Sequence, residues 1–175
     1  MGNVKHRLCF HHYYANIYGA MDVYWRAASI AYRASRVKIH GTVSVRWLVS
    51  PHRHTISAST YRSVRGRDSG TIVMRISPDV RAKGSIRATA LNLAEIVGAF
   101  AHELRHVHDN QHHIRRVRKP TSDEHGTPSE RAAMLEAEHV LQMLTINPHR
   151  RRFDQLTRRL QKNGIRRNLP RRNRV

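Results

Sequence analysis

The chain has 175 residues, enough for one domain with a buried core, and its 32 lysines and arginines against 12 acidic residues give a formal net charge of +20. A single cysteine, Cys9, excludes both a disulfide framework and a cysteine-based zinc site. No apolar run reaches the length of a membrane span, and the N-terminal residues lack a secretory signal, so we expect a cytoplasmic protein with no membrane partner. The charge favours polyanionic partners, including nucleic acid.

The pattern of the first half of the chain predicts one helix followed by strands. Apolar residues recur at three- and four-residue steps from Ile17 to Ala34, which predicts an N-terminal helix. We expect the aromatic side chains of this helix, Tyr24 and Trp25, to lie in the core and not to form a stacking platform. Alternating apolar residues then predict strands at Lys38 to Ser50, Thr55 to Val64 and Thr71 to Ser77. We expect these strands to form a small, mostly antiparallel sheet.

The stretch from Leu91 to Gln111, LNLAEIVGAFAHELRHVHDNQ, contains the motif HExxH at His102, Glu103 and His106. Residues four apart lie on the same face of a helix, so both imidazoles can bind one metal ion. Apolar residues on the opposite side predict a helix, from about Thr89, that is buried in the core. A polar pair on a buried helix is best explained by a metal, and zinc accepts such nitrogen ligands. Glu103 is then the general base that acts on water, and not a ligand.

A further helix is expected after the motif helix. Apolar spacing predicts it from Pro128 or Ser129 to about Ile146, with Ser129 as the N-cap. Eight of the twelve acidic residues lie between Glu95 and Glu138, on the motif helix and the segment after it. The scarce carboxylates therefore gather where a cation would sit.

A catalytic zinc site needs a third protein ligand, and several downstream residues compete for that role. At the start of the further helix, the small residues Ala133 and Ala137 would let the two helices approach closely beside a ligand at Glu130. Of Glu136 and Glu138, only one can face the metal. His112 completes the spacing HExxHxxGxxH, although Asp109 stands where that pattern has glycine. The candidates are Glu130, His112, Glu136 and His125.

The segments AHELRHVHDNQ and PSERAAMLEA resemble the small gluzincin-type zinc metallopeptidases of phages and mobile elements, which are related in layout to ImmA-like and SprT-like peptidases. The resemblance covers about Ala90 to Leu141, and Glu130 stands in the ExxA context in which gluzincin-type members carry their third ligand. It implies an α+β, zincin-like fold, zinc held by His102, His106 and Glu130, and hydrolysis of peptide bonds. SprT-like enzymes would use a histidine in an HG context, as at His125, but the aromatic residue expected after it is missing.

We therefore expect a zinc-dependent metallopeptidase in which metal-activated water attacks a peptide carbonyl while Glu103 transfers the proton to the leaving amine. Thr71 to Ser77 is the expected edge strand for an extended protein or peptide substrate. His108, Asp109 and His139 are candidates for supporting roles around the metal. The histidines without ligand-type spacing to the motif are expected at the surface: His11, His12, His52 and His54.

The C-terminal region, residues 149–175, carries eleven lysines or arginines and one acidic residue, Asp154. We expect a metallopeptidase domain at 1–148 followed by a basic, partly disordered tail with a short helix from Arg151 to Lys162. Such a tail would hold the enzyme near DNA or RNA. The alternative function is a non-catalytic basic nucleic-acid-binding protein with a structural or degenerate metal site. Against it, aromatic residues make up only 6% of the chain and no known nucleic-acid-binding motif is present.

Overall fold

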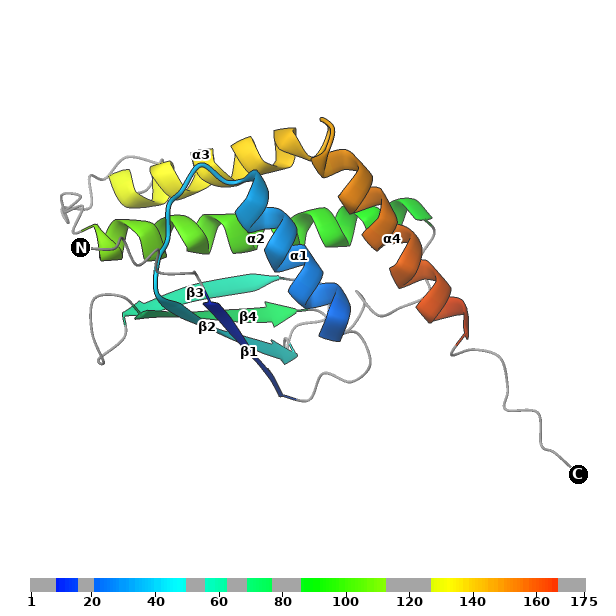
Figure 1. Cartoon of the computed structure of the whole chain (residues 1–175), viewed down its shortest axis with the longest axis horizontal. Coiled ribbons are helices and arrows are strands. Elements are labelled where there is room, and N and C mark those ends of the chain that lie inside the picture. Colours follow the sequence, from blue (N-terminus) through cyan, green and yellow to red (C-terminus); the bar gives the residue numbers. More distant parts are fainter. Residues whose placement is uncertain are drawn as a thin grey trace, which may run out of the picture.

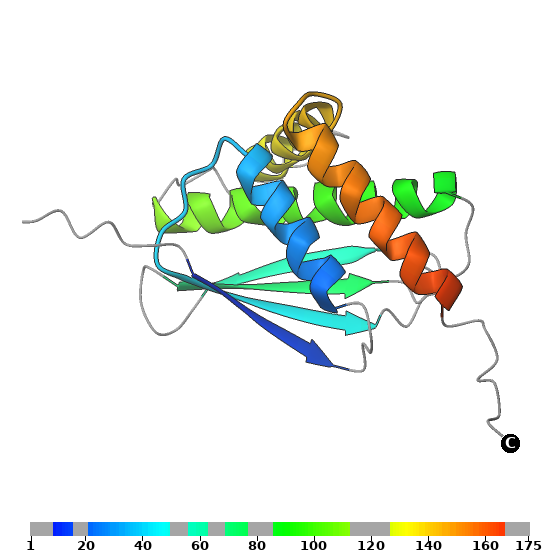
Figure 2. The same cartoon turned by 45° about the vertical axis from the view of Figure 1, so that its right-hand side comes forward.

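The computed structural model describes residues 9–15, 21–49, 56–62, 69–76, 86–112 and 127–166. These residues form an α+β structure in which all four helices lie on one side of a single sheet, with α2 between α3 and the strands (Figures 1 and 2). Within the described residues, no helix combines the length and apolar character needed to cross a membrane. The elements in chain order are β1 (Cys9–Ala15), α1 (Met21–Ala34), β2 (Thr42–Val49), β3 (Ser57–Arg62), β4 (Ser69–Ile76), α2 (Ile86–Gln111), α3 (Pro128–Met143) and α4 (His149–Arg166).

The sheet is mixed, with strand order β1-β2-β4-β3. The pairs β1–β2 and β2–β4 are parallel, and only β3–β4 is antiparallel, so our expectation of a mostly antiparallel sheet is wrong. The reason lies in the connections. Helix α1 returns the chain between β1 and β2, and β3 returns it between β2 and β4, so each of these pairs runs in one direction.

The three predicted strands are present, and a further strand that was not predicted, β1, precedes them. Strand β1 forms one edge of the sheet. Its sequence, CFHHYYA, could have predicted a strand, because it contains Phe10 and two tyrosines. Strand β4 contains Thr71 to Ile76 of the strand predicted at Thr71 to Ser77, and it lies inside the sheet between β2 and β3. The expectation that this segment is an edge strand is therefore wrong, and the edge on that side is β3.

The alternation of β2 fixes which face of the sheet is covered by helices. Val43, Val45 and Trp47 are fully buried, whereas Arg46 between them is exposed. The Trp47 ring stacks on Tyr24 of α1 at 5.3 Å and on Phe100 of α2 at 6.1 Å between ring centroids. This aromatic stack holds α1 and α2 on the sheet.

Helix α2 lies in the middle of the helical layer and is the predicted motif helix. It packs against α1, α3 and α4, and its residues Leu93, Ile96 and Leu104 are fully buried. At Gly98 a side chain would meet Leu141 of α3, because a Cβ there would lie 3.3 Å from Leu141 Cδ1. The missing side chain lets α3 approach α2 one turn before the HExxH histidines.

Two local predictions about helix ends and aromatics need correction. The N-cap of α3 is Thr127 and not Ser129, since the Thr127 side chain accepts a hydrogen bond from the Glu130 N–H. The expected core position is right for Tyr24, which is 1% exposed, but wrong for Trp25, which is 48% exposed. Adjacent residues of a helix point about 100° apart, so only one of the two can face the sheet.

Helix α4 extends the predicted Arg151 to Lys162 helix at both ends. Its Leu156 and Leu160 are 2% and 8% exposed and belong to the same core cluster as the sheet residues. Part of the region that we assigned to a tail beyond residue 148 therefore packs on the domain. Residues 167–175 lie outside the described part of the chain.

Because Trp47 connects β2 with two helices, Trp47→Ala should lower the free energy of unfolding by about 3–5 kcal/mol. Urea unfolding followed by far-UV circular dichroism measures this loss. The matched control is Trp25→Ala, which removes the exposed tryptophan and should cost less than about 1 kcal/mol. Equal losses in the two variants would contradict the assignment of Trp47 to the core.

Candidate metal centre

The two motif histidines project from the same face of α2. Their Nε2 atoms lie 3.1 Å apart, and the ring centroids are separated by 4.9 Å. Both side chains are partly exposed, at 24% for His102 and 18% for His106, while Leu104 on the opposite face is fully buried. The i, i+4 spacing thus gives the predicted result: one side of α2 packs in the core, and the other presents two imidazoles.

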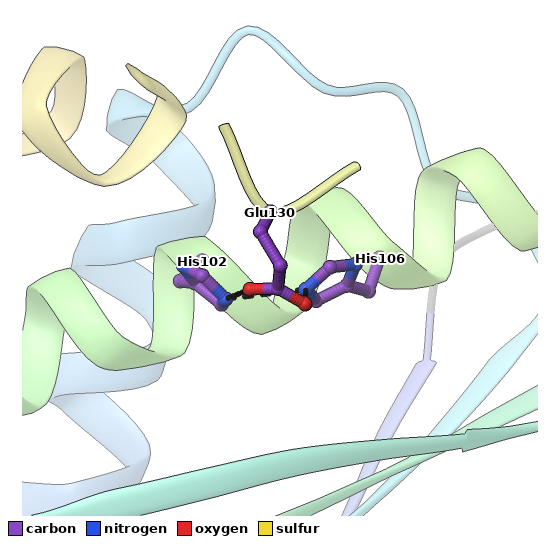
Figure 3. Close-up of side chains that lie close together, drawn as sticks. All are labelled: His102, His106 and Glu130. Atoms are coloured by element: carbon purple, nitrogen blue, oxygen red, sulfur yellow. Dashed lines mark hydrogen bonds and ion pairs between the residues drawn. The ribbon is translucent and has the colours of Figure 1, made fainter. Parts of the chain in front are cut away.

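Glu130 supplies a carboxylate from the first turn of α3, as predicted. Figure 3 shows this carboxylate between the two rings, with Oε2 3.2 Å from His102 Nε2 and Oε1 3.4 Å from His106 Nε2. The residue is held at that position because Thr127 caps the helix through the Glu130 N–H at 3.3 Å and Pro128 begins the first turn.

The spacing of these three groups suits a metal ion. One ligand atom from each of His102, His106 and Glu130 can be chosen so that all lie within 4.8 Å of one another, and the group could hold a metal ion. Zinc bonds of about 2.0–2.1 Å at tetrahedral angles would separate any two ligand atoms by about 3.3 Å. The observed contacts of 3.1, 3.2 and 3.4 Å are close to that value.

Ser129 contacts the far side of one imidazole. Its Oγ lies 3.3 Å from His106 Nδ1, the ring nitrogen that does not face Glu130. A hydrogen bond at this nitrogen fixes the orientation of the ring and leaves Nε2 as the metal-facing atom. This contact was not predicted, since we expected Ser129 to be the N-cap of the helix.

The three residues His102, His106 and Glu130 are called the metal group below. Glu103 lies beside this group but points to the sheet, and it is 5% exposed. Thr60 of β3 donates its hydroxyl to Glu103 Oε2 at 2.6 Å and also lies 3.2 Å from the Glu103 carbonyl oxygen. Burial raises the pKa of the Glu103 carboxyl, and Glu130 acts in the same direction, whereas the Thr60 hydrogen bond and His102 lower it. Held by Thr60, the Glu103 carboxyl does not belong to the group formed by His102, His106 and Glu130.

The metal group opens into a cavity of about 320 Å³. Strand β3 forms one wall of this cavity through Ala58, Ser59 and Thr60. The other lining residues come from α2 and α3: His102, Glu103, His106, Asn110 and Glu130. The predicted general base, the three predicted ligands and an edge strand therefore meet in one hollow.

The other described ligand candidates have different partners. The carboxylate of Glu136 is 1% exposed and accepts a hydrogen bond from the Arg36 N–H at 2.8 Å, with the Arg36 guanidinium at 3.6 Å. His112 Nε2 lies 3.2 Å from the Lys38 carbonyl oxygen, near the end of α2. Neither belongs to the metal group, and Glu138 is exposed.

The residues predicted to have supporting roles around the metal are His108, Asp109 and His139. His108 Nδ1 donates to the Lys38 carbonyl at 2.8 Å, and burial lowers the pKa of this imidazole. Asp109 is buried and accepts from Arg105 Nε at 2.9 Å. His139 is half-buried on α3. Outside the residues or side chains that the structure describes are His11, His12, His52, His54 and His125.

Comparisons with known proteins identify no relative: no family model, no curated protein and no solved structure matches this chain.

We expect the purified chain to bind close to one divalent metal ion. Glu130→Ala should weaken that binding by more than about 100-fold, because loss of a group that only orients a metal ligand already costs about 10–100-fold. A titration in competition with a chelating indicator measures this affinity. Glu138→Ala, which removes an exposed glutamate from the same helix, is the matched control and should bind metal normally. Metal binding that survives Glu130→Ala but is lost in His112→Ala would contradict the assigned ligand set.

Proposed function

We propose that this protein is a zinc-dependent metallopeptidase that hydrolyses peptide bonds of a protein substrate. The observation that carries the proposal is the buried Glu103 carboxylate, which lies beside a three-ligand group without belonging to it. A structural zinc site is closed by four protein ligands, whereas a catalytic site has three and leaves a position for water. Among the described residues, the group offers three ligands.

Zinc is the metal that these donors favour. Two imidazole nitrogens and one carboxylate oxygen form the His2Glu set of catalytic zinc sites, while magnesium and calcium prefer sites made wholly of oxygen. The set also agrees with the ligands that the resemblance to gluzincin-type peptidases implies. When bound, zinc would lower the pKa of a water molecule and polarise the substrate carbonyl.

Glu103 performs the proton transfers in this proposal. Its carboxylate accepts the proton that the attacking water loses and donates it to the amine that leaves when the peptide bond breaks. Burial favours the neutral acid, while the hydrogen bond from Thr60 favours the carboxylate, so the two influences oppose each other. Thr60 thus positions the base and keeps one of its oxygens occupied.

Strand β3 is suited to position an extended peptide. It pairs with β4 on one side only, and its central residues Ala58 to Thr60 border the cavity. A peptide that adds to this edge would bring its backbone across the face of His102 and His106. Backbone hydrogen bonding of this kind accepts many sequences, which favours a protein substrate over a small molecule.

Glu103→Gln should reduce peptidase activity by about 10²–10⁴-fold, because the amide has almost the same shape but cannot accept the proton. A mixture of internally quenched fluorogenic peptides gives the rate, and metal content is measured on the same samples. We expect the variant to retain its zinc. Undiminished cleavage by zinc-loaded Glu103→Gln would contradict the role of Glu103.

Thr60→Val should lower kcat by about tenfold with little change in KM, because it removes the hydroxyl that orients Glu103 and keeps a side chain of similar volume. Thr60→Ser keeps the hydroxyl and should retain most of the activity. Steady-state kinetics on the best peptide of the mixture compares the three proteins. If Thr60→Ser and Thr60→Val lose activity equally, the methyl group matters and the hydrogen bond does not.

A further inference from the structure

A second hollow lies between α1 and α4, away from the metal centre. The two helices run side by side in opposite directions (Figures 1 and 2), and a groove of about 530 Å³ lies between them. It shares no lining residue with the cavity at His102 and Glu130. Any function of this groove is therefore separate from the proposed chemistry.

Cations line both sides of the groove. Helix α1 contributes Arg26 and Arg33. The lining cations of both helices are exposed. None of the described residues that line the groove is acidic. The contribution of α4 is Arg152, Arg158, Arg159 and Lys162.

The sequence of α4 explains why these charges gather here. Leu156 and Leu160 lie one turn apart and pack into the core, so the arginines between and around them must face outward. The floor of the groove is apolar, formed by the buried Ile30 and Leu156. Six cations held around one hollow repel one another and attract a polyanion.

Trp25 adds an aromatic surface to this charged groove. It is 48% exposed, and the Arg26 guanidinium lies 5.8 Å from the centre of its ring. The chain has only two tryptophans, and the other, Trp47, is fully buried. An exposed indole beside arginines is the combination on which nucleic-acid bases stack while their phosphates bind the cations.

We propose that the α1–α4 groove binds single-stranded nucleic acid, with phosphates along the cationic rims and a base stacked on Trp25. Single strands fit because an unpaired base can turn its face to the indole. An anionic membrane fits less well, because the leucines of α4 are buried in the core and cannot enter a lipid layer. An acidic protein segment would bind the cations but would supply no base to stack on the exposed indole of Trp25.

The test uses the full chain and a fluorescein-labelled oligothymidine of about 16 nucleotides, the upper site size of one single-strand-binding fold. Arg152→Gln/Arg159→Gln/Lys162→Gln should weaken binding by about tenfold or more at constant salt. It should also reduce the slope of log affinity against log salt by about 2, as expected for three lost phosphate contacts. The matched control, Lys38→Gln/Arg46→Gln/Arg151→Gln, removes three exposed cations outside the groove and should change affinity much less.

Trp25 is tested without a change in charge. Trp25→Ala should weaken oligothymidine binding by about fivefold or more, and Trp25→Phe should retain most of the affinity, because a base can also stack on phenylalanine. This pair keeps the test decisive if the triple groove variant fails to fold by circular dichroism. Binding should persist in a chelator, because the groove and the metal centre share no residue.

Three results would overturn the proposal. Equal losses in the groove and control triples would mean that the +20 charge attracts polyanions without a defined site. Unchanged binding by Trp25→Ala would remove the stacking role. Tighter binding to phosphatidylglycerol vesicles than to the oligonucleotide, with the same dependence on the groove cations, would assign the surface to a membrane.

Discussion

The contact between the Glu130 carboxylate and the imidazoles of His102 and His106 depends on several features elsewhere in the structure. Three polar groups from two helices converge within 3.1–3.4 Å, and two of them are ring nitrogens that face each other. A cation between the three groups would accept a lone pair from each of them, and the group could hold a metal ion. The absence of a side chain at Gly98 and the Thr127 cap bring α3 to the required position.

Among the described residues, the carboxylates of the candidate metal site and the cations of the groove lie in different places. Carboxylates that serve the proposed chemistry lie on α2 and α3, where Glu103 is buried against Thr60 and Glu130 faces the two histidines. Cations gather on α1 and α4, on a surface that shares no residue with the metal centre. Among the described residues, the cavity at His102 and Glu130 and the cationic groove therefore lie on separate surfaces.

The parts that could be predicted from the sequence are those set by local periodicity. The i, i+4 spacing located His102 and His106 on one face of α2, and the alternation between Lys38 and Ser50 predicted strand β2. Glu130 was one of several candidates, since its convergence with the histidines depends on the approach of α3 to α2 rather than on any local pattern. The sheet order was not predictable in this way, because the pairing of β2 with β4 joins segments that are separated by β3. The contact of Thr60 with Glu103 and the exposure of Trp25 depend on the same tertiary arrangement.

X-ray absorption at the zinc edge of the zinc-loaded chain tests the central claim most directly, since it reports the atoms around the metal without a substrate. We expect a four-coordinate zinc with nitrogen and oxygen neighbours at about 2.0–2.1 Å and the scattering of two imidazoles. In Glu130→Ala the two-imidazole signal should weaken or disappear as the metal is lost. A spectrum with three imidazoles, or a chain that retains no zinc after reconstitution, would contradict the assignment of His102, His106 and Glu130 as a catalytic zinc site.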